Sequence, residues 1–529
     1  MGSVNLFDWD EINFAEAARE MCASSNYLTV QINFEPFWEK PPLFIWFQAL
    51  SMNMFGVTEF AARLPNAIAG VITLLVLFNI GKTVYNEKFG FIWVITYLCS
   101  LLTHFYFKSG IIDPWFNLFI FLGIHYFIVS IGPFRNLNKN RDFILSAIFI
   151  GLGVLTKGPV ALLIFGGTAL IFFILDGFKF KINFFDFFLY GVIVLFVGGF
   201  WFIIQLFLGN TQTIIDFFTY QVRLLSTKDA GHGGFLFYHF IILLFGVFPA
   251  SIFALKAFKY NSSDSEPERY YKKWNIVLLL FVLIVFTIVK TKIVHYSSMC
   301  YFPLTFLASY SIYNLFNFDF EWKKWMSVLI AFIGIPIGLI VSILPFVGIY
   351  KDKIIESNLI KDDFAIANLS ADVYWSGFES IIGIVFILGI IISLILLSYR
   401  QIHRGIYTLF FSSLFFISLS LIIIVPKIEG YSQNAAIEFY KLNSKKDVYI
   451  ETLKFKSYAQ YFYGETKTDK PKEAKDMEWL LKGDIDKNVY FVCKNVHYKE
   501  IIATYPYLEP LYFKNGFVFL VRFKDSYIN

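Results

Sequence analysis

The sequence predicts a polytopic α-helical membrane protein that ends in a small α/β domain. Composition is the first reason: 57% of the residues are hydrophobic and only 16% are charged, whereas a soluble domain is about 25% charged. The second reason is a series of apolar runs long enough to cross a bilayer. The third is a change to mixed polar and apolar sequence after Pro426. The net charge of +5 is too modest to indicate a nucleic-acid partner.

These observations divide the chain into three parts. Residues 1–65 are predicted to form a first outer loop, in which the amphipathic run Leu43–Phe55 lies along the membrane surface. Residues 66–426 form the membrane domain. Residues 427–529 form a separate domain on the outer side.

The membrane domain contains twelve predicted spans, because a crossing helix needs roughly 17–25 apolar residues and some tilt. Thr156-Lys157-Gly158-Pro159 interrupts one stretch and leaves two short halves. The predicted spans are 66–84, 90–107, 114–131, 143–156, 159–175, 184–208, 235–255, 274–290, 297–316, 325–349, 379–398 and 405–425.

Alternate connections between these spans differ in positive charge. Lys and Arg favour the cytoplasmic side of a membrane, so the connections rich in them are predicted to be cytoplasmic. The opposite face then carries residues 1–65, 209–234 and 350–378 with the C-terminal domain, and the unusual polar residues fall there. The basic connections contain Lys82, Lys88, Arg135, Lys139, Arg141, Lys179, Lys181, Lys256, Lys259, Arg269, Lys272, Lys273, Lys323, Lys324, Arg400 and Arg404.

This orientation places residues 1–65 outside, although no apolar run precedes Asp8 to carry them across the membrane. We therefore expect that a first helix is missing from this chain. The alternative is that the first loop crosses the membrane without one.

The C-terminal domain alternates two patterns. Strand-like runs occur at 447–451, 489–493 and 516–522, and helical patterns at 433–443, 471–482 and 497–504. Such alternation is typical of a small α/β domain. The domain contains neither a nucleotide-binding loop nor an obvious catalytic triad.

The first candidate site residues lie in the acidic run Asp8-Trp9-Asp10-Glu11. Asp8 and Glu11 are three residues apart at the start of a helical pattern, so Asp8 could cap the helix with Glu11 completing a capping box. Asp10 would then lie in the first turn, where the helix dipole favours an ionised carboxylate. Asp10 is thus either a catalytic carboxylate or a surface acid.

A second motif, Glu39-Lys40-Pro41-Pro42, precedes the surface-lying run. Two prolines fix the backbone and hold Lys40 at the depth of the lipid headgroups, where an ammonium can meet a phosphate. A lysine that merely extends toward water is the alternative. The rigid Pro-Pro favours a binding site.

The remaining polar residues lie on the same predicted face. Asp113 is at the outer mouth of a span, where it could also serve as a helix N-cap. Lys157 lies between two short apolar runs, where a cation is costly unless it faces a cavity or an anion. Carboxylates suit general-base work or a divalent ion, and cations suit a phosphate leaving group. Two outer loops add Arg223, His232, His295 and Tyr296.

An ordered set of motifs resembles a known family. The motifs are Asp10-Glu11-x-x-Phe14-Ala15-Glu16, Glu39-Lys40-Pro41-Pro42, Glu59-Phe60-Ala61-Ala62-Arg63-Leu64-Pro65, Asp113, Thr156-Lys157-Gly158-Pro159, Gly231-His232-Gly233-Gly234 and Lys292-x-x-His295-Tyr296. In this order they resemble the bacterial lipid-A aminoarabinose transferases and the related protein O-mannosyltransferase-like enzymes. These are integral-membrane class C glycosyltransferases that use a polyprenyl-phosphate sugar.

The resemblance implies a fold of thirteen membrane helices, two juxtamembrane helices and a C-terminal periplasmic domain, which the twelve spans fit if the first helix is absent. It also implies site roles. Asp10 and Asp113 would be the carboxylates of the reaction centre. Lys40, Arg223 and Tyr296 would bind the donor phosphate, with Lys157 lining the cavity.

The resemblance further implies a divalent metal ion held by Glu39 and a histidine near Arg223. This chain has Phe217-Phe218-Thr219-Tyr220-Gln221 there, so His232 is the expected substitute. Glu11, Arg63 and His295 are further candidates because they belong to the matching motifs.

The expected function is transfer of a sugar from a polyprenyl phosphate to a lipid or protein acceptor, with inversion, at the periplasmic face of a bacterial inner membrane. Three alternatives are a transporter or flippase of a lipid-linked sugar, a non-catalytic membrane scaffold whose C-terminal domain binds a partner, and an inactive member of the family that lacks its first helix. A transporter would place polar groups near the bilayer midplane, whereas these residues gather at one face. The sequence selects neither the sugar nor the acceptor.

Overall fold

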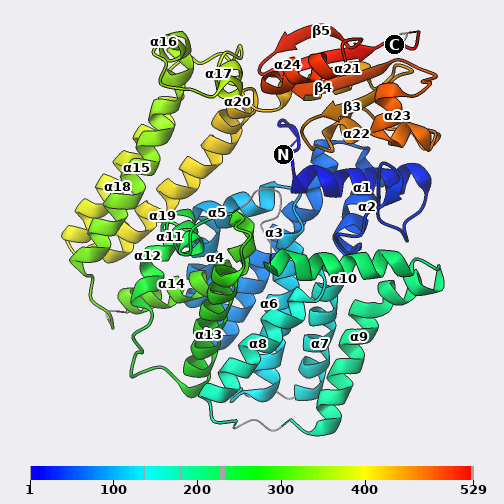
Figure 1. Ribbon diagram of the computed structural model, residues 1–529. Helices are drawn as coiled ribbons and strands as arrows, with labels where there is room; N and C mark the ends of the chain where they lie inside the picture. The colour runs from blue at the N-terminus through cyan, green and yellow to red at the C-terminus, as the bar shows by residue number, and fades with distance from the viewer. Residues whose placement is uncertain (1, 135–137, 179–181, 227–232, 318, 526–529) are drawn as a thin grey trace.

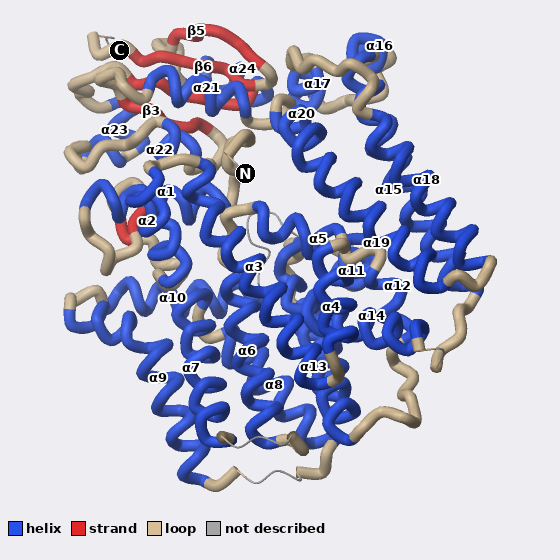
Figure 2. The backbone as a smooth tube through the Cα atoms, turned by 180° about the vertical axis from the view of Figure 1, so that it is seen from behind, coloured by secondary structure: helices blue, strands red, loops and turns tan. Residues whose placement is uncertain are grey.

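The computed structural model describes residues 2–134, 138–178, 182–226, 233–317 and 319–525. It is a helical membrane domain with a small sheet-containing domain at one end, which confirms the predicted fold class. Figure 1 shows the sheet domain stacked above α1 and α2, and Figure 2 shows from behind that the four-stranded sheet is confined to that end.

The N-terminal segment forms two short helices before the first long one. Both pack beneath the sheet domain (Figure 1), and Phe14 of the first contacts Phe44 of the second edge to face. A two-residue antiparallel ladder closes the loop between them. The elements are α1 (Asp10–Ser24), β1 (Gln31–Ile32), β2 (Glu35–Pro36) and α2 (Leu43–Phe55).

The predicted capping box at the start of α1 is wrong. The residue before the helix is Trp9, and no side chain caps the first turn. Glu11 instead forms a buried ion pair with Arg63, because burial of that glutamate demands a cationic partner.

The membrane domain is built from long helices and a few broken ones. In chain order they are α3 (Glu59–Val84), α4 (Glu87–Leu98), α5 (Leu101–Phe105), η1 (Tyr106–Lys108), α6 (Asp113–Ile131), α7 (Lys139–Lys157), α8 (Val160–Leu175), α9 (Phe184–Phe207), α10 (Thr211–Ser226), α11 (Tyr238–Gly246), α12 (Ala250–Lys256), α13 (Glu266–Ile288), η2 (Val294–Cys300), α14 (Tyr301–Phe316), α15 (Lys324–Ile349), α16 (Lys351–Glu356), α17 (Asp363–Leu369), α18 (Ser380–Ser398), α19 (Ile402–Leu419), the π-helical turn η3 (Ser420–Ile424) and α20 (Val425–Glu429).

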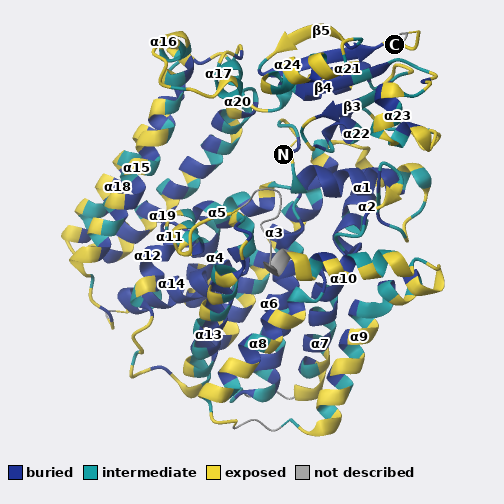
Figure 3. Ribbon diagram, in the orientation of Figure 1, coloured by how far each residue is buried: buried dark blue, intermediate teal, exposed yellow. Residues whose placement is uncertain are grey.

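All twelve predicted runs are helical, but fewer qualify as simple spans. Within the described residues, seven helices are long and apolar enough to cross a membrane, or nine if each of two bent pairs is counted once. The other three are α7, α8 and α14. Helices α8 and α14 have 16 residues each, about 24 Å at 1.5 Å per residue, and α7 contains four charged residues. Figure 3 shows exposed residues along α9, α15 and α18, as expected for lipid-facing helices.

Two broken helices meet inside the domain. Helices α4 and α5 with η1 bend by 84°, and α11 and α12 bend by 111°. The Leu101 amide, just after the first break, donates a 3.0 Å hydrogen bond to the carbonyl of Phe248 in the second. This one bond satisfies an amide freed by the first break and a carbonyl freed by the second. Backbone groups that lack a helical partner at membrane depth need such a bond within the protein.

The basic connections cluster at the end of the helices remote from the sheet domain. Lys88 bonds Asn317 and Lys273 pairs with Asp176, so turns far apart in sequence lie together. Arg135, Lys179 and Lys181 lie outside the described residues.

The C-terminal domain forms a four-stranded sheet in the order β3-β4-β6-β5. Strands β3 and β4 pair in parallel, while β6 runs antiparallel to both β4 and β5. Helix α21 packs on one side of it, where the ring of Phe439 lies 4.5 Å from that of Phe519. The elements are α21 (Asn434–Asn443), β3 (Tyr449–Leu453), α22 (Ala459–Tyr463), η4 (Glu473–Lys475), α23 (Met477–Lys482), β4 (Val489–Lys494), α24 (Asn495–Thr504), β5 (Glu509–Lys514) and β6 (Phe517–Arg522).

Strand β5 was absent from the prediction. It contains Pro510, which discourages a central strand, and it lies at the edge of the sheet with every residue exposed. The hairpin to β6 turns on Asn515 and Gly516, both with positive φ. Asn-Gly is the strongest short-range signal for such a turn, and it would have located the strand.

Close packing of α15 on α18 gives a test of the fold. A Cβ added at Gly383 would overlap the Gly338 carbonyl oxygen and the Ser342 side chain, whereas one at Gly166 would meet nothing within 4 Å. We expect Gly383→Ala to lower the free energy of unfolding by about 1–3 kcal/mol through overpacking. Gly166→Ala is the matched control and should be neutral or slightly stabilising. Equal thermal unfolding midpoints for the two variants in detergent would contradict this packing.

Candidate active site

A cavity of about 670 Å³ lies where the N-terminal segment meets the membrane domain. Its polar walls come from the start of α1, the turn before α2, the first residue of α6, the last residue of α7, α10 and η2. Helix ends thus deliver charged side chains to one place. The polar and charged lining includes Asp10, Glu11, Asn13, Glu39, Lys40, Asp113, Asn117, Lys157, Tyr220, Gln221, His295 and Tyr296.

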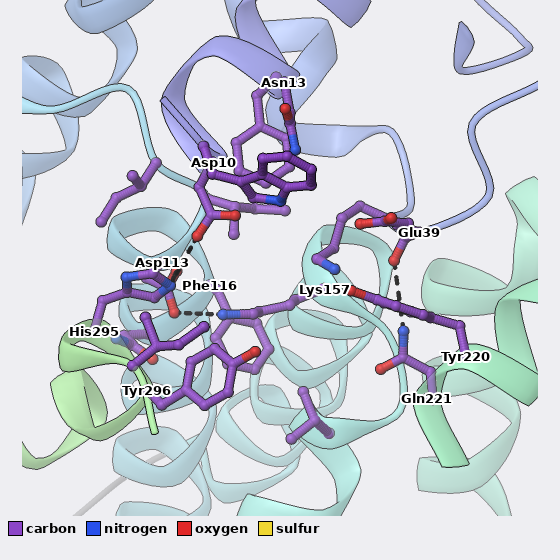
Figure 4. Close-up of a pocket in the computed structure, with 18 of the residues that line it drawn as sticks. Asp10, Asn13, Glu39, Asp113, Phe116, Lys157, Tyr220, Gln221, His295 and Tyr296 are labelled. Atoms are coloured by element: carbon purple, nitrogen blue, oxygen red, sulfur yellow. Dashed lines mark hydrogen bonds and ion pairs between the residues drawn. The ribbon is translucent and has the colours of Figure 1, made fainter. Parts of the chain in front are cut away.

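Two carboxylates face one imidazole in this cavity (Figure 4). His295 Nε2 lies 3.1 Å from Asp10 Oδ2 and 3.9 Å from Asp113 Oδ2. The Asp10 and Asp113 side chains belong to helices that are more than 100 residues apart in sequence. The structure therefore brings together the two carboxylates that the sequence selected and His295, a further candidate from the sequence.

Asp113 also holds a cation. Its Oδ1 accepts a 2.6 Å hydrogen bond from Lys157 Nζ, and the two side chains are only 4% and 15% exposed. Asp113 Oδ2 is buried and has no hydrogen-bond partner among the described residues. An unsatisfied carboxylate oxygen in a cavity needs a donor from a bound molecule or water.

Aromatic rings lie beside three cations in or near the cavity. The Lys40 ammonium lies 5.0 Å from the centre of the Tyr220 ring, and the Arg223 guanidinium lies 5.1 Å from the same ring. Lys157 lies 5.4 Å from the ring of Tyr296. A ring attracts a cation without neutralising it, so the contact with Tyr220 leaves the Lys40 charge uncancelled.

The electrostatics of Asp10 follow from these neighbours. Burial alone would raise the pKa of its carboxyl, but the hydrogen bond with His295 and the charges of His295, Lys40 and Lys157 outweigh burial and lower the pKa to about 2. Burial in turn lowers the pKa of Lys40 below the usual range. Asp10 is therefore ionised at any physiological pH.

Glu11 lines the cavity, and its partner Arg63 lies outside the lining. Arg63 is 2% exposed and binds Glu11 through both Nε and Nη2, at 2.7 and 2.8 Å. Glu11 also accepts hydrogen bonds from the backbone amides of Phe7 and Gly110. The carboxylate oxygens of Glu11 are thus occupied within the protein, which makes it a support for the segment that contains Asp10.

The predicted metal ligands are not brought together in the described part of the chain. Glu39 lines the cavity, and its backbone oxygen accepts a 3.5 Å hydrogen bond from Gln221. His232 lies outside the described residues. Among those described, no group of three or more His, Cys, Asp and Glu side chains has a metal-binding arrangement. A divalent ion held by Glu39 and His232 therefore stays a prediction.

Three cavity residues were not selected from the sequence. Tyr220 and Gln221 were noted only as part of a loop, yet they supply a ring for Lys40 and a contact to Glu39. Asn117 donates to Ser298 behind Asp113. One helical turn separates Asn117 from Asp113, and that spacing was the available signal.

Comparison with known proteins supports the family resemblance. A family model described as dolichyl-phosphate-mannose-protein mannosyltransferase matches residues 39–203. The undecaprenyl phosphate-alpha-4-amino-4-deoxy-L-arabinose arabinosyl transferase 1 of Proteus mirabilis is 25% identical over 317 residues, covering 59% of this chain and 56% of that protein. Its counterpart from Shewanella sediminis is 24% identical over 362 residues, covering 66% and 63%.

The fold agrees with a solved structure. The crystal structure of ArnT from Cupriavidus metallidurans bound to undecaprenyl phosphate is similar to the whole chain and to 96% of that protein, with a TM-score of 0.76 at 15% identity. The matched region spans between half and two thirds of the length of the curated relatives named above. Together, the sequence and fold similarities confirm the resemblance to these membrane glycosyltransferases.

The buried ion pair between Asp113 and Lys157 predicts that loss of either partner destabilises the fold. Asp113→Asn leaves the Lys157 charge without its carboxylate partner, and loss of one partner of a buried pair costs about 3 kcal/mol. Adding Lys157→Met should recover most of this loss. Glu321→Gln breaks the exposed pair with Lys323 and is the control, with no measurable change expected. Chemical unfolding in detergent checks this, and equal stability of Asp113→Asn and Glu321→Gln would refute it.

Proposed function

We propose that this chain is a glycosyltransferase that moves a sugar from a polyprenyl phosphate to a lipid acceptor. The observation that carries the proposal is the arrangement of Asp10 and Asp113 around His295, with Lys40 and Lys157 facing the same cavity. The carboxylates suit an acceptor nucleophile, and the cations beside them suit a leaving phosphate.

The cavity also has an apolar part that suits a polyprenyl tail. This part is lined by Phe116, Val160, Leu163, Ile164, Phe286, Val289 and Met299. A lipid-linked sugar would lay its tail here and direct its phosphate to Lys40, with Arg223 and Tyr296 beside it. The relatives whose names include undecaprenyl phosphate support this class of donor.

The proposed reaction is a single displacement at the anomeric carbon. An oxygen of the acceptor attacks this carbon, the bond from the carbon to the phosphate oxygen breaks, and the electron pair leaves with the polyprenyl phosphate. Attack from the side opposite the phosphate inverts the anomeric centre. Lys40 and Lys157 stabilise the charge that grows on the leaving group.

The role of Asp10 depends on the acceptor. A hydroxyl acceptor must lose a proton, which Asp10 and His295 could accept as a hydrogen-bonded pair. A phosphate acceptor is already ionised, so Asp10 would then orient it or stabilise positive charge on the sugar. The resemblance to lipid-A aminoarabinose transferases favours a lipid A-like acceptor, and the name of the family model favours a protein.

We place the reaction at the periplasmic face of a bacterial inner membrane. The cavity lies at the end of the helices opposite the basic connections, and basic connections favour the cytoplasm. The partners would be the lipid-linked donor, the acceptor and the surrounding membrane lipids.

The rival functions make different demands. A transporter needs polar groups near the bilayer midplane, whereas the cavity charges come from helix ends such as Asp113 and Lys157. If the chain were a non-catalytic scaffold, the carboxylates and cations that line its cavity would have no role. Release of polyprenyl phosphate only when an acceptor is present would separate an enzyme from both, and an inactive family member would release none.

Three variants test the proposed centre. With a labelled polyprenyl-phosphate sugar and lipid A as acceptor, Asp10→Asn should lower kcat about 100-fold, as removal of a preorganised electrostatic group does, while donor binding stays near normal. Asp113→Asn, assayed at a temperature where it is folded, should also lower kcat. Lys40→Met should mainly weaken donor binding. Glu321→Gln controls for expression and handling, and near-normal turnover in Asp10→Asn and Asp113→Asn would refute the centre.

The low pKa of Asp10 predicts a pH dependence. A depressed pKa means that the ionised form is favoured in the folded protein, so the contribution of Asp10 is lost only as the pH falls through about 2. His295→Ala removes the hydrogen bond that lowers this pKa, while burial still raises it. We expect the acid limb of the rate to move to higher pH in this variant. Profiles of kcat against pH check this, and an unmoved limb would show that His295 does not set the charge of Asp10.

A further inference from the structure

The backbone that leads into Asp10 is held by the C-terminal domain. Leu6 is fully buried, its amide donates a 2.7 Å hydrogen bond to the Tyr463 hydroxyl, and its carbonyl accepts a 2.6 Å hydrogen bond from the Gln433 side chain. Both polar groups of one residue, four positions before Asp10, are therefore satisfied by a domain that begins more than 400 residues later.

The membrane domain holds the same segment from the other side. Arg63 donates to the carbonyls of Val4 and Asn5 at 2.7 and 2.9 Å, in addition to its ion pair with Glu11. Residues 4–6 thus lie between α3 and the C-terminal domain. We call residues 4–9 the strap.

Side chains strengthen the contact between the strap and the C-terminal domain. Asn5 donates to Glu429 and Asn434 and accepts from Lys441, each at 3.0–3.1 Å. Trp9, directly before Asp10, lies 5.2 Å from the ring of Tyr458. The strap is therefore contacted by α20, α21 and the start of α22.

Tyr463 does not take part in the cavity. It is 5% exposed and is absent from the cavity lining, whereas Asp10 is part of that lining. Any effect of Tyr463 on the reaction must therefore pass through the backbone that it holds. That backbone is short, because an extended chain covers about 3.3 Å per residue and only four steps separate Leu6 from Asp10.

We propose that Tyr463 and Gln433 are positioning residues that fix Asp10 against His295, so that the C-terminal domain is part of the catalytic apparatus. The inference rests on the proposed function. Catalytic groups must be held within about 0.5 Å of their productive position, and a misplacement of about 1 Å can cost 100-fold in rate. A strap without these two bonds would let the start of α1 shift by such amounts.

A matched pair of tyrosine variants tests the proposal. Tyr463→Phe removes only the hydroxyl that accepts from Leu6. Tyr461→Phe makes the same change two residues earlier in α22, where the hydroxyl bonds Glu451 within the domain at 3.3 Å. With the full chain in detergent, we expect Tyr463→Phe to lower kcat about tenfold while the donor KM stays within twofold. Tyr461→Phe should stay within twofold in both.

A double-mutant cycle distinguishes positioning from general stabilisation. If Tyr463 acts through Asp10, its substitution should have little further effect on the residual rate of Asp10→Asn, because the group that it positions is gone. A purely structural role would lower the rate by the same factor in both backgrounds. Gln433→Met, which removes the bond to the Leu6 carbonyl, should reproduce the pattern if Tyr463→Phe fails to fold.

The outcomes separate this inference from the proposed function. If Asp10→Asn turns over normally, the proposed centre is wrong and the positioning role falls with it. If Asp10→Asn is impaired but Tyr463→Phe equals Tyr461→Phe, or if the cycle is additive, only the positioning role is overturned. A tenfold loss that disappears in the Asp10→Asn background supports it.

Discussion

The ion pair between Glu11 and Arg63 is the constraint on which the site depends. Both side chains are at most 3% exposed, and each uses its remaining polar atoms on backbone groups of the strap or of the loop before α6. A buried pair is not by itself a source of stability, but breaking it leaves an uncompensated charge. It therefore fixes the register between α1, α3 and the Gly110 loop, and this register brings Asp10 to Asp113.

The cavity keeps opposite charges close without letting them all cancel. Lys157 is paired with Asp113, whereas Lys40 lies against the ring of Tyr220. Asp113 Oδ2 has no hydrogen-bond partner among the described residues. This arrangement costs free energy when no ligand is bound, because a buried polar or charged group without a partner has lost its hydration. The same cost becomes useful when a bound molecule supplies both a negative group and a hydrogen-bond donor.

The sequence predicted the fold class and most site residues because these depend on local signals. Apolar length located the helices, and charges that are costly in a membrane marked Asp10, Lys40, Asp113 and Lys157. Errors arose where tertiary contacts override local rules. Glu11 fits a capping box in sequence, but its real partner is 52 residues away. His295 looked secondary because nothing in its own loop shows that it meets two carboxylates.

Several predicted spans differ from simple crossing helices for a related reason. Hydropathy detects apolar runs, yet it does not show that a run bends, as at Phe248, or ends after 16 residues as in α14. Such breaks depend on partners elsewhere in the chain, here the bond between Leu101 and Phe248. The edge strand β5 was not predicted, although the Asn-Gly turn that follows it signals a hairpin.

The contact between the strap and α22 also determines when the protein can mature during synthesis. Leu6 leaves the ribosome before the hydroxyl that satisfies its amide, which lies 457 positions later in the chain. Until α22 has been made, the backbone that leads into Asp10 has its contacts with Arg63 but not those with the C-terminal domain. Nascent chains that stop before α22 should therefore insert their helices and still lack this second hold on the reaction centre.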